Sequence, residues 1–361
     1  MTHTTNNPNS SEPRYAVEDL LAFAAQLLQR AGLAQERAQV VADILVEGDL
    51  MGHTTHGLQL LTPYLRDLEA GKMTKEGDPV LVADQGAAIT WDGRYLPGPW
   101  LTIQAMDLAF ERIAQHPIVT IVIRQSHHIG SLASYPKRAT DKGLMLLLTC
   151  SDPSVQTVAP YGGIEPIYTP NPLAAGIPTQ GDPILLDISM SCTANGLVWR
   201  LQSQGQRLPH QWLLDNQGNP SDDPAVLATE PPGSILPLGG MDVGYKGFAL
   251  GILVEALTAA LGGHGRSDQP TQWGASTFLQ LIDPEAFGGR EHFLRETSWF
   301  ADTCRDNSTK PGNPPVRLPG ERALKLRAEQ LQQGVALYPT ILPALEAWTE
   351  KFGVPLPTPI A

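Results

Sequence analysis

The sequence contains little cysteine, the residue on which small secreted folds and many zinc sites depend. It has only Cys150, Cys192 and Cys304, which lie far apart and lack the paired spacing of metal ligands. A scattered, odd-numbered set of this kind excludes a disulfide-based scaffold. It predicts reduced thiols and a cytoplasmic protein.

Basic residues are also in short supply. There are 25 Lys and Arg residues against 37 Asp and Glu residues, which gives a formal net charge of -12 at pH 7. A chain with this balance repels nucleic acid and anionic membrane surfaces as a whole, so neither is expected as a partner. An anionic nucleotide would need a local cluster of basic side chains.

Long apolar runs and one glycine motif are missing as well. No run reaches the roughly 18 apolar residues that span a bilayer, and the polar N-terminus has no basic segment followed by an apolar one. We therefore expect no membrane segment and no secretion signal, and we interpret residues 1–14 as a disordered tail. The absence of Gly-x-Gly-x-x-Gly between a strand and a helix disfavours the common dinucleotide-binding fold.

Helical patterns begin soon after the tail. A chain of 361 residues with 42% hydrophobic residues exceeds what one core absorbs, so two or three lobes are expected. Thr62 as N-cap, Pro63 at the first helical position and Gly71 after the end predict a short helix. The other segments with helical spacing are 17–31, 34–47, 100–114, 131–142, 248–262, 320–337 and 342–352.

Short apolar runs separated by turn residues predict strands in the middle of the chain. They lie at 80–83, 87–91, 118–122, 144–148 and 184–186. Strands mixed with helices indicate the α/β class. The stretch 203–239, rich in Pro, Gly, Asp and Gln, predicts a loop-rich insertion, and a polar, Pro-rich linker is expected between Phe300 and Pro315.

The stretch from Asp49 to Tyr64 concentrates polar chemistry at a chain reversal. Gly52 and Gly57 bracket two histidines and two threonines, so the backbone can turn sharply and approach another molecule. The hydroxyl of Thr55 beside the imidazole of His56 forms a candidate proton-transfer unit. A threonine that caps a helix, with histidines on a polar surface, explains the same residues, and the local sequence leaves both interpretations open.

Further motifs follow in a fixed order along the chain. They are Ser126-His127-His128-Ile129-Gly130, Pro160-Tyr161-Gly162-Gly163, Asn171-Pro172-Leu173, Leu186-Asp187-Ile188-Ser189-Met190-Ser191, Gly244-Tyr245-Lys246-Gly247-Phe248 and Leu318-Pro319-Gly320-Glu321. Together with Asp49-x-x-Gly52-x-x-Thr55-His56-Gly57, this series resembles the malate/L-lactate dehydrogenase type of oxidoreductase. That family also contains sulfolactate, ureidoglycolate and diketogulonate oxidoreductases and the piperideine and pyrroline carboxylate reductases.

The resemblance, which runs from about Val17 onward, implies a particular architecture. It is a non-Rossmann α/β fold with a largely antiparallel central sheet and a discontinuous helical domain built from the two termini. The expected boundaries are 15–78 plus 316–361 for the helical domain and 79–315 for the NAD(P)-binding α/β domain. A homodimer is implied too.

The resemblance also implies a reaction, with NAD or NADP as the cofactor and a small molecule as the substrate. Hydride would pass between the nicotinamide and a 2-oxo or 2-hydroxy acid, or a cyclic 2-imino acid. His56 would be the proton donor or acceptor, supported by Thr55 and Asp187. The residues implied at the cofactor are His128, Gly130, Asn171, Tyr245, Lys246, Arg317, Pro319, Gly320 and Arg322.

Two of these expectations have a physical argument of their own. Lys246 lies between glycines at the expected start of an apolar helix, where helix amides and an ammonium group both attract phosphate. For Arg317 and Arg322 the argument starts from the resemblance: the matching segment lies at the cofactor and is rich in arginine in the cyclic imine reductases, which favours NADP over NAD because a 2'-phosphate suits a guanidinium.

The chain departs from the family pattern at two positions of this site. Thr55 replaces a serine and keeps its hydroxyl, whereas Leu60 replaces an arginine that holds cofactor or substrate anions. Two alternatives therefore accompany the oxidoreductase: a repurposed family member that binds nucleotide without catalysis, and a metal-dependent hydrolase. The histidines that the second would use have no nearby Cys or carboxylate at a recognisable metal spacing, so no metal is expected.

Overall fold

The structure, a computed structural model, describes residues 13–360. Its contacts divide the chain into two units, one made of the chain up to Glu76 with the segment from Arg322 onward, the other of Gly77–Glu321. Of the tail expected over residues 1–14, residues 1–12 lie outside the described part. Arg14 belongs to strand β1 (Arg14–Tyr15), so the expectation is wrong at that residue.

The first unit is helical, with a small two-stranded pairing. Strand β1 pairs antiparallel with β12 (Val335–Ala336). The helices bury leucine-rich faces, with Leu20 and Leu28 on α1, and Ile44 and Leu45 on α2, fully buried. The helices are α1 (Val17–Arg30), α2 (Gln35–Leu50), α3 (Leu61–Glu69), α9 (Glu321–Gln333) and α10 (Glu346–Phe352).

Helix α3 differs from its prediction at its start. A 3-10 turn, Leu58–Leu60, leads directly into it, and its N-cap is Leu60 instead of Thr62. The Thr62 hydroxyl donates to the Ala344 carbonyl at 3.2 Å, so tertiary contact uses the group that the sequence assigned to capping. Pro63 remains within the first turn, where its missing N–H leaves no helical hydrogen bond unmade.

The C-terminal helix α9 fixes the end of α2. Gln330 is buried and its amide donates to the carbonyls of Asp49, at 3.0 Å, and Leu50, at 2.9 Å. Arg327 pairs with Glu47 at 2.6 Å. Because the last carbonyls of a helix have no partners within it, the Gln330 amide satisfies two of them and links α9 to the point where Asp49 enters the loop with the histidines.

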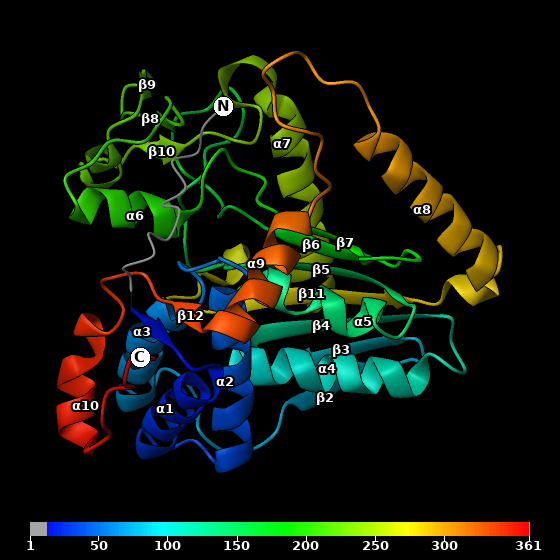
Figure 1. The fold of residues 1–361 in the computed structure, drawn as a ribbon. Helices are drawn as coiled ribbons and strands as arrows, with labels where there is room; N and C mark the ends of the chain where they lie inside the picture. Colours follow the sequence, from blue (N-terminus) through cyan, green and yellow to red (C-terminus); the bar gives the residue numbers. More distant parts are fainter. Residues whose placement is uncertain (1–12, 361) are drawn as a thin grey trace. The chain divides into compact units, whose positions relative to one another are not determined.

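A mostly antiparallel sheet organises the second unit (Figure 1). In the described part of the chain it has seven strands in the order β2-β3-β4-β11-β5-β6-β7, and only β3 and β4 run parallel. This arrangement confirms the non-Rossmann α/β prediction. The strands are β2 (Val80–Asp84), β3 (Ala88–Asp92), β4 (Ile118–Ser126), β5 (Met145–Ser151), β6 (Leu173–Ile177), β7 (Ile184–Ile188) and β11 (Ala275–Ile282).

Helices cover the sheet because its central strands alternate apolar side chains on both faces. On one face, the side chains of Ile123 and of Leu101 in helix α4 (Gly98–Arg112) both lie close to the Cα of Gly93. Val122, which points to the opposite face, lies against Gly262, just beyond helix α7 (Gly240–Glu255) and its continuation. A shorter helix, α5 (Pro136–Thr140), packs on β5 and β6.

Three predictions about helices, and the predicted set of strands, need correction. Helix α7 begins at Gly240 and runs to Glu255, with a π-helical continuation at Ala256–Ala260, whereas the sequence placed its start near Gly247. The predicted helix 131–142 is a 3-10 turn followed by the shorter α5. Helix α8 (Arg290–Arg305) continues through Phe300, where a linker was expected, and strands β6 and β11 were not predicted.

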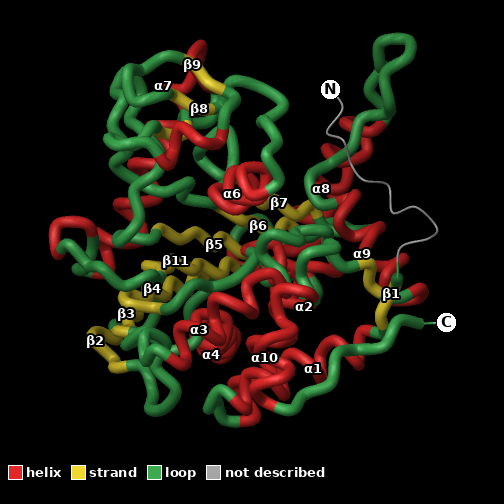
Figure 2. The backbone as a smooth tube through the Cα atoms, turned by 90° about the vertical axis from the view of Figure 1, so that its left-hand side faces the viewer, coloured by secondary structure: helices red, strands yellow, loops and turns green. Residues whose placement is uncertain are grey.

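The insertion at 203–239 contains its own small sheet, which lies apart from the central strands (Figure 2), with helix α6 (Asn195–Ser203) beside it (Figure 1). Strand β8 (Leu213–Leu214) lies between β9 (Pro220–Ser221) and β10 (Ser234–Ile235). The sheet and α6 share an apolar core that includes Val198, Leu213 and Ile235. The stretch is therefore a small lobe stabilised by burial, although most of its residues form turns as expected.

Candidate active site

The loop after α2 owes its shape to Asp49. The buried carboxylate accepts the N–H of Leu58 at 2.7 Å, which pulls the two ends of the loop together. A Cβ on Gly57 would lie 2.4 Å from that carboxylate, and one on Gly48 would lie 3.2 Å from the Cα of Gly57. The glycines are therefore required for close packing around Asp49, in addition to the turn that the sequence indicated.

Within this loop the structure joins Thr55 and His56. The Thr55 hydroxyl lies 2.9 Å from Nδ1 of His56, and both side chains are half-buried. A hydroxyl bonded to Nδ1 restrains the rotation of the imidazole and makes Nδ1 a poor position for exchange with a substrate. Proton exchange would then use Nε2. Leu60, the departure from arginine, lies in the 3-10 turn that follows.

The second pair of histidines, His127 and His128, directly follows strand β4 in the other unit. His127 is fully buried, and Nδ1 of His128 accepts the N–H of Gly130 at 3.1 Å. The indole of Trp273 stacks on His128, with ring centroids 4.9 Å apart and planes at 29°. A Cβ on Gly98 would come within 2.2 Å of the His127 carbonyl oxygen, so the start of α4 supports the histidine backbone.

Asp187 lies in β7, close to the predicted cofactor segment. Its carboxylate accepts the N–H of Ala133 at 3.0 Å. Two residues earlier, the Leu185 N–H donates to the Pro319 carbonyl at 3.1 Å, and a Cβ on Gly320 would lie 2.7 Å from that of Leu185. The segment Arg317–Gly320 therefore continues the sheet edge beside Asp187. The pairing of Asp187 with His56 stays a prediction.

Asn171 belongs to a buried polar network. It is fully buried, and its amide donates to the Gly251 carbonyl at 3.1 Å and to Glu255 at 3.0 Å. Arg266 binds Glu255 at 2.9 Å and the Ser151 hydroxyl at 3.0 Å. The Asn171 amide nitrogen therefore donates to groups of the protein itself, as expected of a residue that fixes the shape of the surrounding loop.

The α7 residues of the predicted cofactor set lie on the surface. Tyr245 is 51% exposed, packs edge-on against Tyr161 at 5.9 Å, and lies beneath the Lys246 ammonium at 5.9 Å. Helix α7 is broken at Val243, whose backbone is not helical (φ -128°, ψ 21°), so Lys246 lies in the first turn after the break. Its ammonium remains exposed to an anion.

Arg317 and Glu321 complete this region. Burial alone would raise the pKa of Glu321, but hydrogen bonds from Arg305 and from the Leu318 N–H outweigh it and hold that pKa below its usual range. Arg317 is exposed beside this carboxylate, and Arg322 is exposed on α9 in the other unit. Gly320, at φ +90°, packs its backbone against Leu185 where a Cβ would not fit, and the exposed guanidinium of Arg317 three residues earlier suits an anionic group such as a dinucleotide phosphate.

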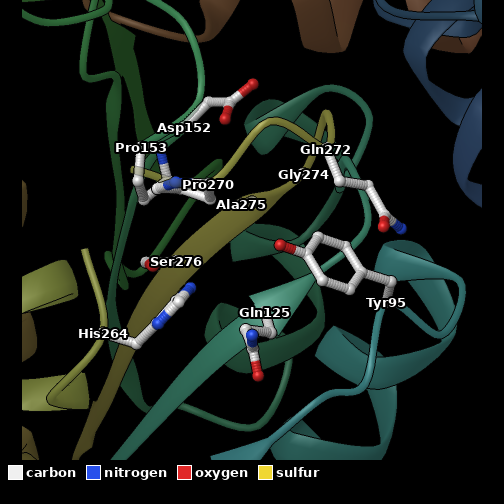
Figure 3. Close-up of a pocket in the computed structure, with 10 residues that line it drawn as sticks. All are labelled: Tyr95, Gln125, Asp152, Pro153, His264, Pro270, Gln272, Gly274, Ala275 and Ser276. Atoms are coloured by element: carbon white, nitrogen blue, oxygen red, sulfur yellow. The ribbon is translucent and has the colours of Figure 1, made fainter. Parts of the chain in front are cut away.

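A small pocket lies at the ends of β4, β11 and β5 (Figure 3). Tyr95 and His264 point inward in this view. Three buried polar atoms around it, Oδ2 of Asp152, Nε2 of His264 and Oγ of Ser276, have no hydrogen-bond partner among residues 13–360. Burial raises the pKa of the Asp152 carboxyl, against the hydrogen bonds from Ser154 that lower it. The lining residues are Tyr95, Gln125, Asp152, Pro153, His264, Pro270, Gln272, Gly274, Ala275 and Ser276.

The sequence missed several residues of this region. Glu255 had a usable signal, since it is the only charged residue between Phe248 and Leu261. Asp152 directly follows the β5 run, a position where loops often carry function. Trp273 had no such signal, because its contact with His128 depends on the pairing of β11 with β4. Within residues 13–360, no group of three His, Cys, Asp or Glu side chains could hold a metal ion.

Comparison with known proteins gives one consistent result. The family model described as malate/L-lactate dehydrogenase matches residues 15–346. The L-lactate dehydrogenase of Cupriavidus necator is 32% identical over 344 residues, which cover 93% of this chain and 97% of that protein. The (2R)-3-sulfolactate dehydrogenase (NADP(+)) of Chromohalobacter salexigens is 31% identical over 320 residues, covering 86% and 90% of the two chains.

Solved structures agree with the sequence comparisons. The delta1-piperideine-2-carboxylate reductase of Pseudomonas syringae pvar. tomato superposes with a TM-score of 0.81 at 25% identity. The match covers 93% of this chain and 99% of that one.

Proposed function

Because the chain belongs to the malate/L-lactate dehydrogenase family, we propose that it transfers hydride between NAD(P)H and a 2-oxo acid or a cyclic 2-imino acid, with His56 exchanging the proton. The class, an NAD(P)-dependent dehydrogenase or reductase acting on hydroxy or oxo acids, follows from the family. The substrate and the role of His56 are the proposal. The observation that carries it is the Thr55–His56 contact at 2.9 Å, in a loop closed by the hydrogen bond from the Leu58 N–H to Asp49 and by close packing at Gly48 and Gly57.

When bound, the nicotinamide would supply the hydride for C2 of the substrate, or take it up in the reverse direction. In reduction, the developing charge on oxygen, or the lone pair on nitrogen, takes a proton from His56 through Nε2. Thr55 restrains the imidazole through Nδ1, and Asp187 is proposed to stabilise the protonated form. The product would be a 2-hydroxy acid or a cyclic 2-amino acid.

The substrate class can be decided by turnover. Lactate, malate and sulfolactate analogues represent the acids in the relatives' names, and piperideine-2-carboxylate represents the cyclic imines. Each would be assayed in both directions with NAD(H) and NADP(H), by absorbance of the reduced nicotinamide. Turnover of at least one compound is expected. If both nucleotides bind and no compound of either class is turned over, a repurposed binding protein becomes the better explanation.

The preference for NADP over NAD is a further expected result. Because the protein carries a charge of -12, the exposed guanidinium groups of Arg317 and Arg322 are proposed to supply charge for a 2'-phosphate. Arg317→Ala and Arg322→Ala should each weaken NADPH binding by about 10-fold, the loss of one charge-assisted hydrogen bond, and NADH binding by less.

Fluorescence titration of both cofactors measures this preference. Arg295→Ala, which removes an exposed arginine on α8 paired only with its neighbour Glu296, provides the control. Equal, small losses for NADPH and NADH in both test variants would remove the reason to prefer NADP.

A homodimer is proposed from the outer face of α7. Ile252 is 54% exposed, Leu253 49% and Leu261 57%, although the opposite face is buried against the rest of its unit. The span Gly240–Ala260 is apolar and long enough, at 21 residues, to cross a bilayer by length and composition, a test that helices of soluble proteins also pass. A contiguous apolar face of this kind is typical of a protein interface, and a second copy is its proposed partner.

Ile252→Glu should convert the dimer to a monomer, because it places a charge in the centre of the apolar contact. Light scattering after size exclusion measures the mass. Leu331→Glu, on the comparably exposed Leu331 of α9, is the matched control and should remain dimeric. A wild-type monomer at micromolar concentration, or a dimer that survives Ile252→Glu, would contradict the proposed interface.

A further inference from the structure

Trp273 contacts both histidines at the end of β4. Its indole stacks on His128 at 4.9 Å and 29°, and meets His127 edge-on at 5.0 Å and 73°. Aromatic rings at these distances prefer offset-stacked and edge-to-face arrangements, and both are present here. One side chain therefore restrains two neighbouring imidazoles.

The backbone around Trp273 holds the indole in place. Ala275 pairs with Ser126 across the β11–β4 ladder, and a Cβ on Gly274 would lie 2.5 Å from the Ser126 carbonyl oxygen. Residues 272 and 274 line the pocket of Figure 3. Trp273, which lies between them, does not line the pocket, and its indole lies against the two histidines.

The hydrogen bond at His128 defines the chemical consequence. The Gly130 N–H donates to Nδ1 at 3.1 Å, so Nδ1 presents a lone pair and the proton of the neutral ring is on Nε2. This hydrogen bond requires the N–H to lie near the plane of the imidazole. A flat indole against one face of the ring keeps the plane in that orientation.

We propose that Trp273 is a positioning residue that fixes the imidazole plane of His128, so that His128 offers an Nε2–H donor to an oxygen acceptor of the bound dinucleotide. The identity of the ligand, a dinucleotide, rests on the proposed function. The orientation of the His128 imidazole by Trp273 does not depend on the proposed function. Trp273 acts only through His128 and is not assigned a contact with the substrate.

The test compares Trp273→Leu, which removes the aromatic face, with Trp273→Phe, which keeps one. The matched control is Trp212→Leu, because Trp212 packs on a histidine of its own, His210, at 5.3 Å and 50°. Nitrogen-15 NMR of the histidine rings in cofactor-free protein, with His128→Gln to assign His128, reports the tautomer. The ring-current shift of the His128 protons reports the stack.

In wild type we expect His128 as the Nε2–H tautomer with upfield-shifted ring protons. In Trp273→Leu the ring protons of His128 should lose their upfield shift, and the nitrogen-15 shifts of Nδ1 and Nε2 should move toward a common value as the two tautomers exchange. Trp273→Phe and Trp212→Leu should retain the wild-type pattern. NADPH affinity, by fluorescence titration, should fall about 2- to 10-fold in Trp273→Leu, and Trp273→Phe should restore most of the loss.

Two results would overturn the proposal. One is a His128 spectrum unchanged by Trp273→Leu, and the other is an equal loss of affinity in Trp212→Leu, which would indicate general destabilisation. If the spectra change as expected but wild-type protein binds neither NADH nor NADPH, the proposed function fails and the cofactor role of His128 fails with it, while the ring orientation by Trp273 is supported.

Discussion

His56→Ala is expected to lower kcat by about 10²- to 10⁴-fold while cofactor affinity stays within a few-fold of wild type. The reason is that a general acid acts on charge that develops in the transition state and contributes little to binding the nucleotide. The measurement is steady-state kinetics on a compound from the substrate panel, with a separate titration of NADPH. Asp187→Asn should act in the same direction, through a less stable imidazolium.

Thr55 supplies the graded controls for this prediction. Thr55→Val removes the hydroxyl that contacts Nδ1 and should lower kcat by about 2- to 10-fold, the usual range for one hydrogen bond. Thr55→Ser keeps the hydroxyl and should remain near wild type. If His56→Ala turns over a confirmed substrate at near wild-type rate with chemistry limiting, His56 is not the proton donor.

Gly98→Ala is expected to be the most damaging small substitution in the second unit. The added Cβ would lie 2.2 Å from the His127 carbonyl oxygen, 2.4 Å from that of His128 and 2.7 Å from the His128 carbonyl carbon. These are backbone atoms and cannot rotate away, so the segment has to move. Overpacking of this kind costs about 1 to 3 kcal/mol, and a displaced histidine backbone can lower kcat/KM by about 10²-fold.

Urea unfolding and steady-state kinetics measure the two effects of Gly98→Ala. Gly288→Ala is the matched control, because a Cβ there would meet no atom within 4 Å and its φ is not positive. It should leave both stability and activity unchanged. A Gly98→Ala protein with wild-type stability and kinetics would show that the histidine segment is not held by close packing against α4.

The sequence by itself determined the class of this protein. The apolar spacing in α1 and α2, and the short runs of β2 to β5, are local patterns, and local patterns specify helices and strands without knowledge of their partners. Ordered motifs such as Thr55-His56-Gly57 identified the family. The Thr55–His56 contact was also within reach, because the two residues are adjacent in the chain.

The tertiary structure decided everything that depends on residues distant in sequence. Thr62 lost its capping role to a contact with Ala344, and α7 extended its start to Gly240. Buried strands such as β11 resemble any short apolar run, so their place between β4 and β5 comes only from hydrogen bonding across the sheet.

Trp273 and Gln330 show the same limit at the level of single residues. The indole reaches His128 only because β11 pairs with β4, and the Gln330 amide reaches the end of α2 across some 280 residues of chain. Such contacts follow from the surface that two packed elements share. A linear sequence lists the residues of that surface without stating which of them meet.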